Sequence, residues 1–246
     1  MVSVETHNEI EKVERGAFDD CTSLRGINLP GVREIEDEAF LNCISLTDVE
    51  FGNKLETIGE NAFDSCPLQK IKIPTVRAIE DWAFDECTQL TDVELPYVER
   101  IGVGAFIRCR RLRRIALPLK DNMFPLDTFH QRYNQFDDCG DLATVDLLGV
   151  GGIHKTISSL LLESWRDEMN EEIDRINQDL PNTPADEKTA AIHHWIRSVI
   201  DRMEYYKAEH NRLLKEDMTQ LELAVWKVNL DEEGYSSSTM LPTLRL

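Results

Sequence analysis

Residues 83–96 read AFDECTQLTDVELP, where an Ala-Phe pair and a cysteine precede a run of alternating polar and apolar residues. The start of this segment recurs along the chain as AFDDCTSL, AFLNCISL, AFDSCPL, AFIRCRRL and QFDDCGDL. Its first five phenylalanines are separated by 22, 23, 21 and 22 residues, and the sixth follows after 30. They are Phe18, Phe40, Phe63, Phe84, Phe106 and Phe136. The chain therefore carries an internal repeat.

Each copy of the repeat predicts a strand and a turn. In TDVEL, Val93 and Leu95 point to one side of a half-buried strand, and Pro96 ends it because proline donates no ladder hydrogen bond. Ile79, Ala83 and Phe84, with the cysteine three residues further on, follow spacings that predict a helical or 3₁₀ turn facing inward. One unit cannot bury its own apolar side, but stacked units can. We expect a solenoid in which each repeat forms one rung and equivalent strands form a parallel sheet.

This pattern resembles the BspA-type leucine-rich repeat, whose consensus is close to I-G-x-x-A-F-x-x-C-x-x-L-x-x-I-x-L-P, over residues 13–147. The resemblance implies an α+β chain with a right-handed solenoid of short parallel strands, about six rungs in residues 1–149. Members of this family are usually described as interaction surfaces and not as enzymes. The sixth copy departs from the consensus: Gln135 replaces alanine, and residues 127–136 are expected to carry an insertion that bulges from the rod. At the other end, Val2 and Val4 are expected to form a partial cap strand, so the first rung is frayed or the chain is a fragment.

After Gly152 the apolar period changes from that of a strand to that of a helix. The first helical stripe is Ile157, Leu160, Leu161, Trp165, Met169, Ile173, Ile176 and Leu180. The second is Ile192, Ile196, Val199, Ile200, Met203, Tyr206, His210, Leu213 and Leu214. Between them, Thr183 and Pro184 form a helix-start signature. The apolar spacing can run on through Leu221 and Val225, but EDMT (216–219) favours a break there. We expect an antiparallel helical hairpin with a shorter third helix in residues 154–230, and a flexible tail at 231–246.

Apolar stripes at helical spacing are typical of residues that pack into a core. The more specific alternative is that they form a seam through which two chains associate. The segment also resembles the tail of a large group of BspA-like proteins from single-celled algae, mainly diatoms. That resemblance implies no particular activity. Exposure of Trp195, Trp226 or the pair Tyr205–Tyr206 would favour the seam.

Composition excludes several functions. Asp and Glu total 46 against 27 Lys and Arg, and both halves of the chain are acidic, so charge disfavours nucleic-acid or anionic-membrane binding. No apolar run approaches the ~20 residues of a membrane span. The first residues lack the pattern of a signal peptide. We expect a cytoplasmic or nuclear protein that is not secreted.

Two charged features are candidate binding sites. Outward residues of successive strands alternate in sign from Asp48 and Glu50 through Lys70 and Lys72 to Asp92, Glu94 and Arg114. This alternation is typical of a surface that neutralises itself, and a charged recognition face is the alternative. The second feature is RCRRLRR, a positive patch comprising Arg108, Arg110, Arg111, Arg113 and Arg114. It either docks the acidic helical part of the chain, is solvated, or binds an acidic partner or a phosphate.

All six cysteines occupy one column of the repeat, three residues after each phenylalanine: Cys21, Cys43, Cys66, Cys87, Cys109 and Cys139. Disulfide or zinc chemistry normally uses cysteines paired by local spacing, and no such pair exists. We predict buried, reduced thiols that pack as small apolar side chains and donate to backbone carbonyls at the turn.

The sequence offers no catalytic, metal or cofactor site. The six histidines are scattered, and none of the common nucleophile, phosphate-loop or zinc motifs is present. We therefore predict a non-catalytic scaffold that binds another protein. The alternative is a structural or oligomerising protein that acts through residues 154–230.

Overall fold

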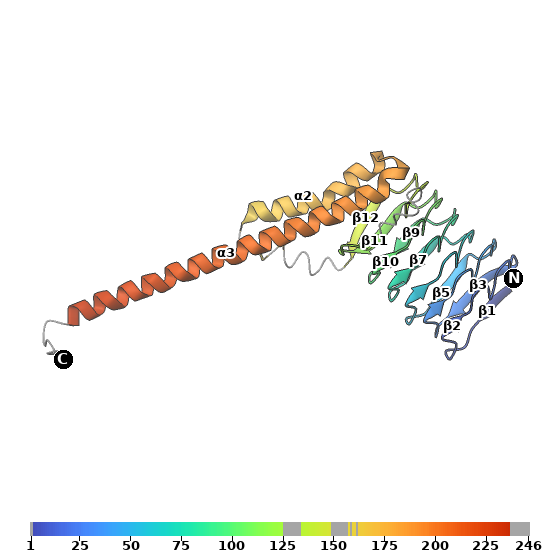
Figure 1. Ribbon diagram of the computed structural model, residues 1–246, viewed down its shortest axis with the longest axis horizontal. Helices are drawn as coiled ribbons and strands as arrows, with labels where there is room; N and C mark the ends of the chain where they lie inside the picture. Colours follow the sequence, from blue (N-terminus) through green and yellow to red (C-terminus); the bar gives the residue numbers. More distant parts are fainter. Residues whose placement is uncertain (1, 125–133, 149–156, 158, 161, 237–246) are drawn as a thin grey trace.

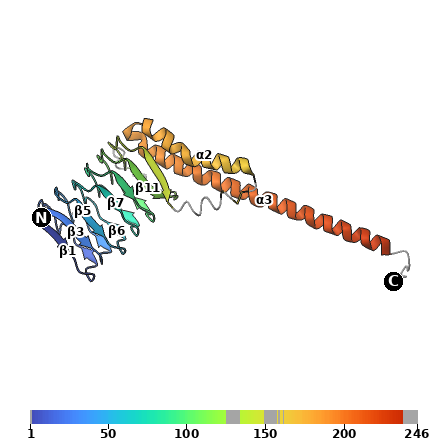
Figure 2. The same ribbon diagram turned by 180° about the vertical axis from the view of Figure 1, so that it is seen from behind.

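The computed structural model describes residues 2–124, 134–148, 157, 159, 160 and 162–236. The strands stack along a rod with the N-terminus at its free end, and two helices lie at the other end (Figure 1). Seen from behind, the longer helix projects well past the shorter one (Figure 2). The predicted α+β solenoid followed by a helical region is thus confirmed.

The strands form three parallel sheets along the rod. The first has the order β1-β3-β5, the second β7-β9-β11-β12, and the third β2-β4-β6-β8-β10. The strands of the first two sheets are β1 (Val2–Glu5), β3 (Leu24–Leu29), β5 (Asp48–Phe51), β7 (Lys70–Lys72), β9 (Asp92–Glu94), β11 (Arg114–Pro118) and β12 (Thr144–Leu148). The third sheet contains the two-residue strands β2 (Lys12–Val13), β4 (Glu34–Ile35), β6 (Thr57–Ile58), β8 (Ala78–Ile79) and β10 (Arg100–Ile101). The expected partial cap strand at Val2 and Val4 exists as β1, which pairs with β3.

The third sheet corrects one prediction. Ile79 and its equivalents do not open a helical turn, because they lie in this second column of strands and pair with the same position of the next rung. The turn that follows is not helical or 3₁₀ either, since Trp82 and Glu86 adopt left-handed backbone angles, with φ of 52° and 50°. These angles, four residues apart, recur in the turns that carry Phe18, Phe40, Phe63 and Phe106, and glycine occupies the first position at Gly16 and Gly104.

The alternation of backbone angles gives the turns their own inter-rung hydrogen bonds. The N–H groups of Trp82, Phe84 and Glu86 donate to carbonyls of the next rung at 3.0, 2.9 and 3.1 Å. The N–H groups between them stay within the rung: that of Asp85 donates to Trp82, and that of Cys87 to Phe84. Each turn therefore contributes to rung stacking much as a strand does, which satisfies its backbone without regular secondary structure.

The core is a column of phenylalanine rings running the length of the rod. Neighbouring rings stack with centroids 5.1, 5.0, 5.4, 5.3 and 5.8 Å apart, from Phe18 to Phe136. Each pair contributes about 0.5–1.5 kcal/mol beyond burial of its area. Phe136 rejoins the column in spite of the longer spacing before it. Most of the expected insertion lies in residues 125–133, outside the described residues.

The helical region contains α2 (Glu163–Asp179), two 3₁₀ turns, η1 (Leu180–Asn182) and η2 (Ala185–Glu187), and α3 (Lys188–Ser236). The helices pack against each other, with Met169, Ile176, Ile192 and Val199 buried between them and the rod. The expected break at residues 216–219 is wrong, because α3 continues through them as one helix of 49 residues. Neither glycine nor proline interrupts that segment, and Arg212 pairs with Glu216 one turn further along, at 2.6 Å.

The start of the second helix also differs from prediction. Thr183 does not cap it; its hydroxyl donates to the carbonyl of Asp179, at 3.0 Å, and Thr183 ends η1. At the other end, α3 extends to Ser236, beyond the end expected at residue 230.

The two helices close the end of the solenoid. Within the described residues no further rung follows the last one, and side chains of α2 and α3 form hydrogen bonds with its backbone. Thr189 accepts the N–H of Phe136 at 3.1 Å, and Asn177 accepts that of Val145 at 2.8 Å. Lys188, only 2% exposed, donates to the carbonyls of Gly140 and Leu142 in the same rung.

Candidate interaction surface

The strand face neutralises much of its own charge. In register, Lys72 lies beside Glu94, with Nζ and Oε1 2.9 Å apart. The guanidinium of Arg114 contacts the carboxylates of Asp92 at 2.9 Å and Asp146 at 2.6 Å, one on each neighbouring strand. This part of the face is the self-neutralising surface that the sequence favours.

We expected Asp48 and Glu50 to lie beside the lysines of the next strand, Lys70 and Lys72. The two strands are not paired, because β5 and β7 belong to different sheets. The rung between them is irregular: its segment Cys66–Leu68 is one residue shorter than its equivalents. Pro67 within it has no N–H to donate.

Ion pairs between successive rungs also follow the edge of the third sheet. Each joins a basic residue to a carboxylate about 20 residues away in the sequence. They are Lys12 with Glu34 and Glu36, Arg15 with Glu38, Arg33 with Glu56, Arg77 with Glu99, and Arg100 with Glu80. Exposed pairs are worth about 0–1 kcal/mol each, so their main effect here is to leave few cations free for a partner.

The arginine cluster divides into paired and unpaired members. Arg108 donates to Asp85 and contacts Glu86, and Arg111 donates to Gln89 in the same preceding rung, at 2.6 Å. Arg114 is held on the strand face as described above. None of these contacts involves α2 or α3, so docking of the cluster onto the helices is not what the described residues show.

Arg110 and Arg113 remain exposed, and no hydrogen bond or ion pair reaches either guanidinium from the described residues. Their neighbours in the stack explain why. The backbone of Arg113 is bonded to Thr91 on one side and Ala143 on the other, neither of which carries a charge. The same holds for Arg110, because the equivalent positions of the preceding and following rungs are the uncharged Thr88 and Gly140. The structure therefore presents two exposed, unpaired arginines three residues apart in one rung of an acidic rod.

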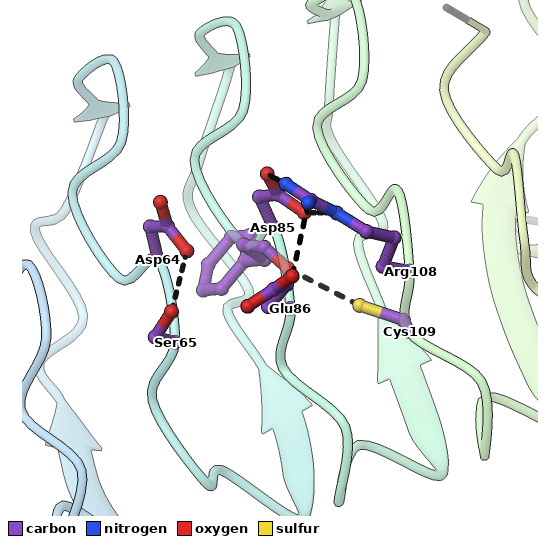
Figure 3. Close-up of polar contacts among 7 residues, drawn as sticks. Asp64, Ser65, Asp85, Glu86, Arg108 and Cys109 are labelled. Atoms are coloured by element: carbon purple, nitrogen blue, oxygen red, sulfur yellow. Dashed lines mark hydrogen bonds and ion pairs between the residues drawn. The ribbon is translucent and has the colours of Figure 1, made fainter.

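Beside this cluster, a carboxylate lacks the partner that its equivalent has. Figure 3 shows Arg108 facing Asp85 and Glu86, while Asp64 in the preceding rung receives a hydrogen bond from Ser65, at 2.9 Å. Arg108 lies one rung after Asp85 and pairs with it. The equivalent position one rung after Asp64 is occupied by Glu86, which is acidic and cannot form such a pair. Burial, with the nearby carboxylates of Asp85 and Glu86, raises the pKa of Asp64 to about 6.

Five of the six cysteines in the column are buried, and Cys21 departs from the prediction. All six thiols are free, and all but the half-exposed Cys21 are buried. Each buried thiol donates to the phenylalanine carbonyl of the preceding rung: Cys43 to Phe18, Cys66 to Phe40, Cys87 to Phe63, Cys109 to Phe84 and Cys139 to Phe106, over 3.0–3.2 Å. Burial raises the pKa of Cys87, Cys109 and Cys139, which disfavours the reactive thiolate.

Aromatic residues of the helices fall into two groups. Trp195 and Tyr206 are buried, and Trp195 donates to the carbonyl of Glu172. Tyr205 and Trp226 are 61% and 70% exposed. The exposure of Trp226 favours a binding surface on the distal part of α3. The sequence pattern alone did not distinguish between a helix packed in the core and a helix that pairs with another chain.

Sites for chemistry are not found among the described residues. No group of His, Cys, Asp and Glu there could hold a metal ion. None of the described helices combines the length and apolar character that a membrane span requires. A hollow of about 430 Å³ along α2 and α3 is lined by Ser198, His194 and Asp201 among others, but no hydrogen bond joins these three.

A rod of stacked short strands with an inward phenylalanine and cysteine in every turn defines a leucine-rich-repeat protein. Six copies of the BspA type leucine rich repeat region match residues 11–135, half of the chain, and the protein belongs to this family. The expected family membership is confirmed.

A solved structure agrees with the fold. A leucine-rich repeat protein of T. pallidum is 31% identical over 59% of this chain and 69% of its own, with a TM-score of 0.52. A leucine-rich repeat protein of Bacteroides ovatus is 26% identical over 57% of this chain, with a TM-score of 0.45, and the match spans 35% of its length. Among curated proteins, none matches this sequence.

Proposed function

We propose that the protein is a non-catalytic scaffold whose solenoid binds an acidic segment of another protein through Arg110 and Arg113. The leucine-rich-repeat fold generally mediates protein–protein interaction, which supports the class of function. The observation that supports the site is that the exposed guanidinium groups of Arg110 and Arg113 have no ion pair among the described residues, in a rod where many of the other basic side chains are paired. Free arginines are suited to carboxylate recognition because each presents a planar fork of donors.

Pull-down from the native source with the intact chain tests this proposal. The variant Arg110→Glu/Arg113→Glu should lose at least ~10-fold of the specifically bound protein, equivalent to about 1.4 kcal/mol of binding free energy. Its free energy of unfolding should change by less than about 1 kcal/mol, because neither side chain has a partner to lose.

The matched control is Arg25→Glu. Arg25 occupies the same column as Arg113, in β3, is exposed, and its side chain likewise has no partner among the described residues. It should leave binding unchanged because no second arginine stands beside it. Equal binding by the double variant and the intact chain would contradict the proposed site.

A second candidate function is self-association through the helices. The exposed apolar side chains at the distal end of α3 favour it, and their arrangement specifies how two chains would meet.

A further inference from the structure

The distal part of α3 is a long helix without a covering element in the described chain. At 1.5 Å per residue, its 49 residues span about 73 Å, whereas the 17 residues of α2 span about 25 Å. The start of α2 lies near Tyr206, whose ring stacks on Trp165 with centroids 5.2 Å apart. Beyond that point no other described helix or strand accompanies α3, as Figure 1 shows.

This projecting segment carries an apolar seam. Leu214, Met218, Leu221 and Val225 are 41%, 60%, 63% and 56% exposed. Their spacings of 4, 3 and 4 are those of the d, a, d and a positions of heptads, which lie on one face of a helix. Most of the large apolar side chains exposed on the described chain lie on α3. An apolar stripe of this kind is stable in water when another helix covers it.

We propose that the seam pairs with the seam of a second copy as an antiparallel two-helix coiled coil. The charged residues that flank the seam favour a second copy of this helix as its partner, and they favour the antiparallel over the parallel arrangement. With Leu214 and Leu221 at d, Lys215 and Glu222 occupy e, and Asp217 occupies g. In a parallel pair, g faces the e of the next heptad, so Asp217 would oppose Glu222 of the second copy on both sides.

In an antiparallel pair, e faces e. When Met218 is opposite Leu221 of the second copy, Leu214 is opposite Val225, and both layers are repeated by the two-fold axis. Lys215 then lies beside Glu222 of the second copy, and this attractive contact also occurs twice. The seam is therefore complementary to itself in one direction and repulsive in the other, which is how charges specify coiled-coil orientation.

The placement of the solenoid agrees with this direction. The rod and α2 are attached at the N-terminal end of α3 (Figure 2). Two antiparallel copies would hold their rods at opposite ends of the shared coil, which keeps both arginine faces free. The inference deepens the second proposed function and does not depend on the acidic partner of the solenoid.

Sedimentation equilibrium of the full chain tests the proposal. The intact chain should be dimeric at about 100 µM, a concentration that populates complexes of Kd near 10 µM. Leu221→Lys should be monomeric at that concentration. Leu223→Lys is its matched control: Leu223 is 66% exposed, but it lies about 200° away around the helix, so this variant should dimerise like the intact chain.

Charge variants test the direction. Glu222→Lys should raise the dissociation constant at least ~10-fold, because it places two lysines against each other at both contacts, and Lys215→Glu/Glu222→Lys should restore it. Circular dichroism confirms that each variant remains helical. A monomeric intact chain, or equal loss in the Leu221 and Leu223 variants, overturns the self-association. Tighter dimerisation by Glu222→Lys overturns the antiparallel direction, since that change would relieve repulsion from Asp217 in a parallel coil. None of these outcomes bears on binding through Arg110 and Arg113.

Discussion

The side-chain nitrogen of Lys188 lies 2.9 Å from the carbonyl oxygen of Gly140, which joins the first residue of α3 to the last rung of the solenoid. The same ammonium donates to Leu142, and burial lowers its pKa. Repeat rods need a terminal element that satisfies the backbone groups of the last repeat. α2 and the proximal part of α3 are therefore a C-terminal cap, which leaves the distal part of α3 available for another role.

Replacing Lys188 tests the cap. Lys188→Ala should lower the free energy of unfolding by about 1–3 kcal/mol, because the buried carbonyl of Leu142 and the partly buried one of Gly140 lose their donor. Urea unfolding followed by circular dichroism measures the loss. The exposed Lys207, also on α3, supplies the control, and Lys207→Ala should change stability by less than about 0.5 kcal/mol. A similarly small effect at Lys188 would show that the helices hold the rod by apolar packing alone.

The stability of the chain should depend on pH through Asp64. Its folded-state pKa of about 6 lies above the ordinary value of 3.8, so the folded chain binds more protons between these values. The contribution of this group therefore falls as pH rises from about 4 to 6 and is fully lost above that range. Asp64→Asn should raise stability at pH 7.5 by on the order of 1 kcal/mol, after allowance for partial exposure, and have little effect near pH 4.

Asp85→Asn is the counterpart, because Asp85 is buried and paired with Arg108. It should destabilise the chain at pH 7.5, the opposite sign to Asp64→Asn. Thermal unfolding at both pH values compares the two. If both substitutions destabilised the chain at pH 7.5, the carboxylate of Asp64 would have a favourable partner after all.

The repeat columns could be predicted because their period is strong and their residues are buried in every rung. The turn conformation could not be predicted, since the spacings of 4, 1 and 3 between Ile79, Ala83, Phe84 and Cys87 fit a helical turn as well as they fit alternating backbone angles. A signal did exist: Gly16 and Gly104, with Asn42 and Asn61, occupy the left-handed positions, and glycine and asparagine favour that conformation.

The pairing of the arginines and the length of α3 could not be predicted from a single repeat, because the pairing depends on how neighbouring rungs align. Arg108 pairs with Asp85, 23 residues before it, and this offset follows only from knowing how neighbouring turns align. The same alignment separates Arg110 and Arg113 from their paired neighbours. An uninterrupted α3 is one of two outcomes that the sequence allows, because the apolar spacing runs on through Leu221 and Val225, whereas the polar residues Glu216, Asp217 and Thr219 favour a loop although none of them breaks a helix.

Reactivity of the thiols should follow their position in the rod. Titration with a thiol reagent should find one fast group in the native chain, the half-exposed Cys21, and six groups after denaturation without reductant. Cys21→Ser should remove the fast phase and leave the slow ones. Fewer than six groups on denaturation would indicate a disulfide.

Within the column, Cys87→Ser should lower the free energy of unfolding by roughly 1–3 kcal/mol. The thiol donates to Phe63 over 3.2 Å in a fully buried site, and a hydroxyl brings a more polar group to the same place. Chemical unfolding measures the change. Binding of the folded variant should be unaffected, because the site does not reach the surface.

The left-handed turn positions make a separate prediction, best tested at Asp20. Its φ is 53°, its side chain is exposed, and its N–H donates to Leu41 of the next rung at 2.9 Å. Residues with a Cβ cost roughly 1–2 kcal/mol in this conformation, and β-branched residues are the least tolerated. Asp20→Val should therefore destabilise the chain by about 1–2 kcal/mol, whereas Asp20→Gly should be neutral or stabilising by up to about 1 kcal/mol. Asp19→Val controls for loss of an exposed carboxylate in the same turn, because the N–H of Asp19 donates within its own rung, to Gly16. Equal losses for the two valine variants would mean that the charge, and not the backbone angle, determines stability at this turn.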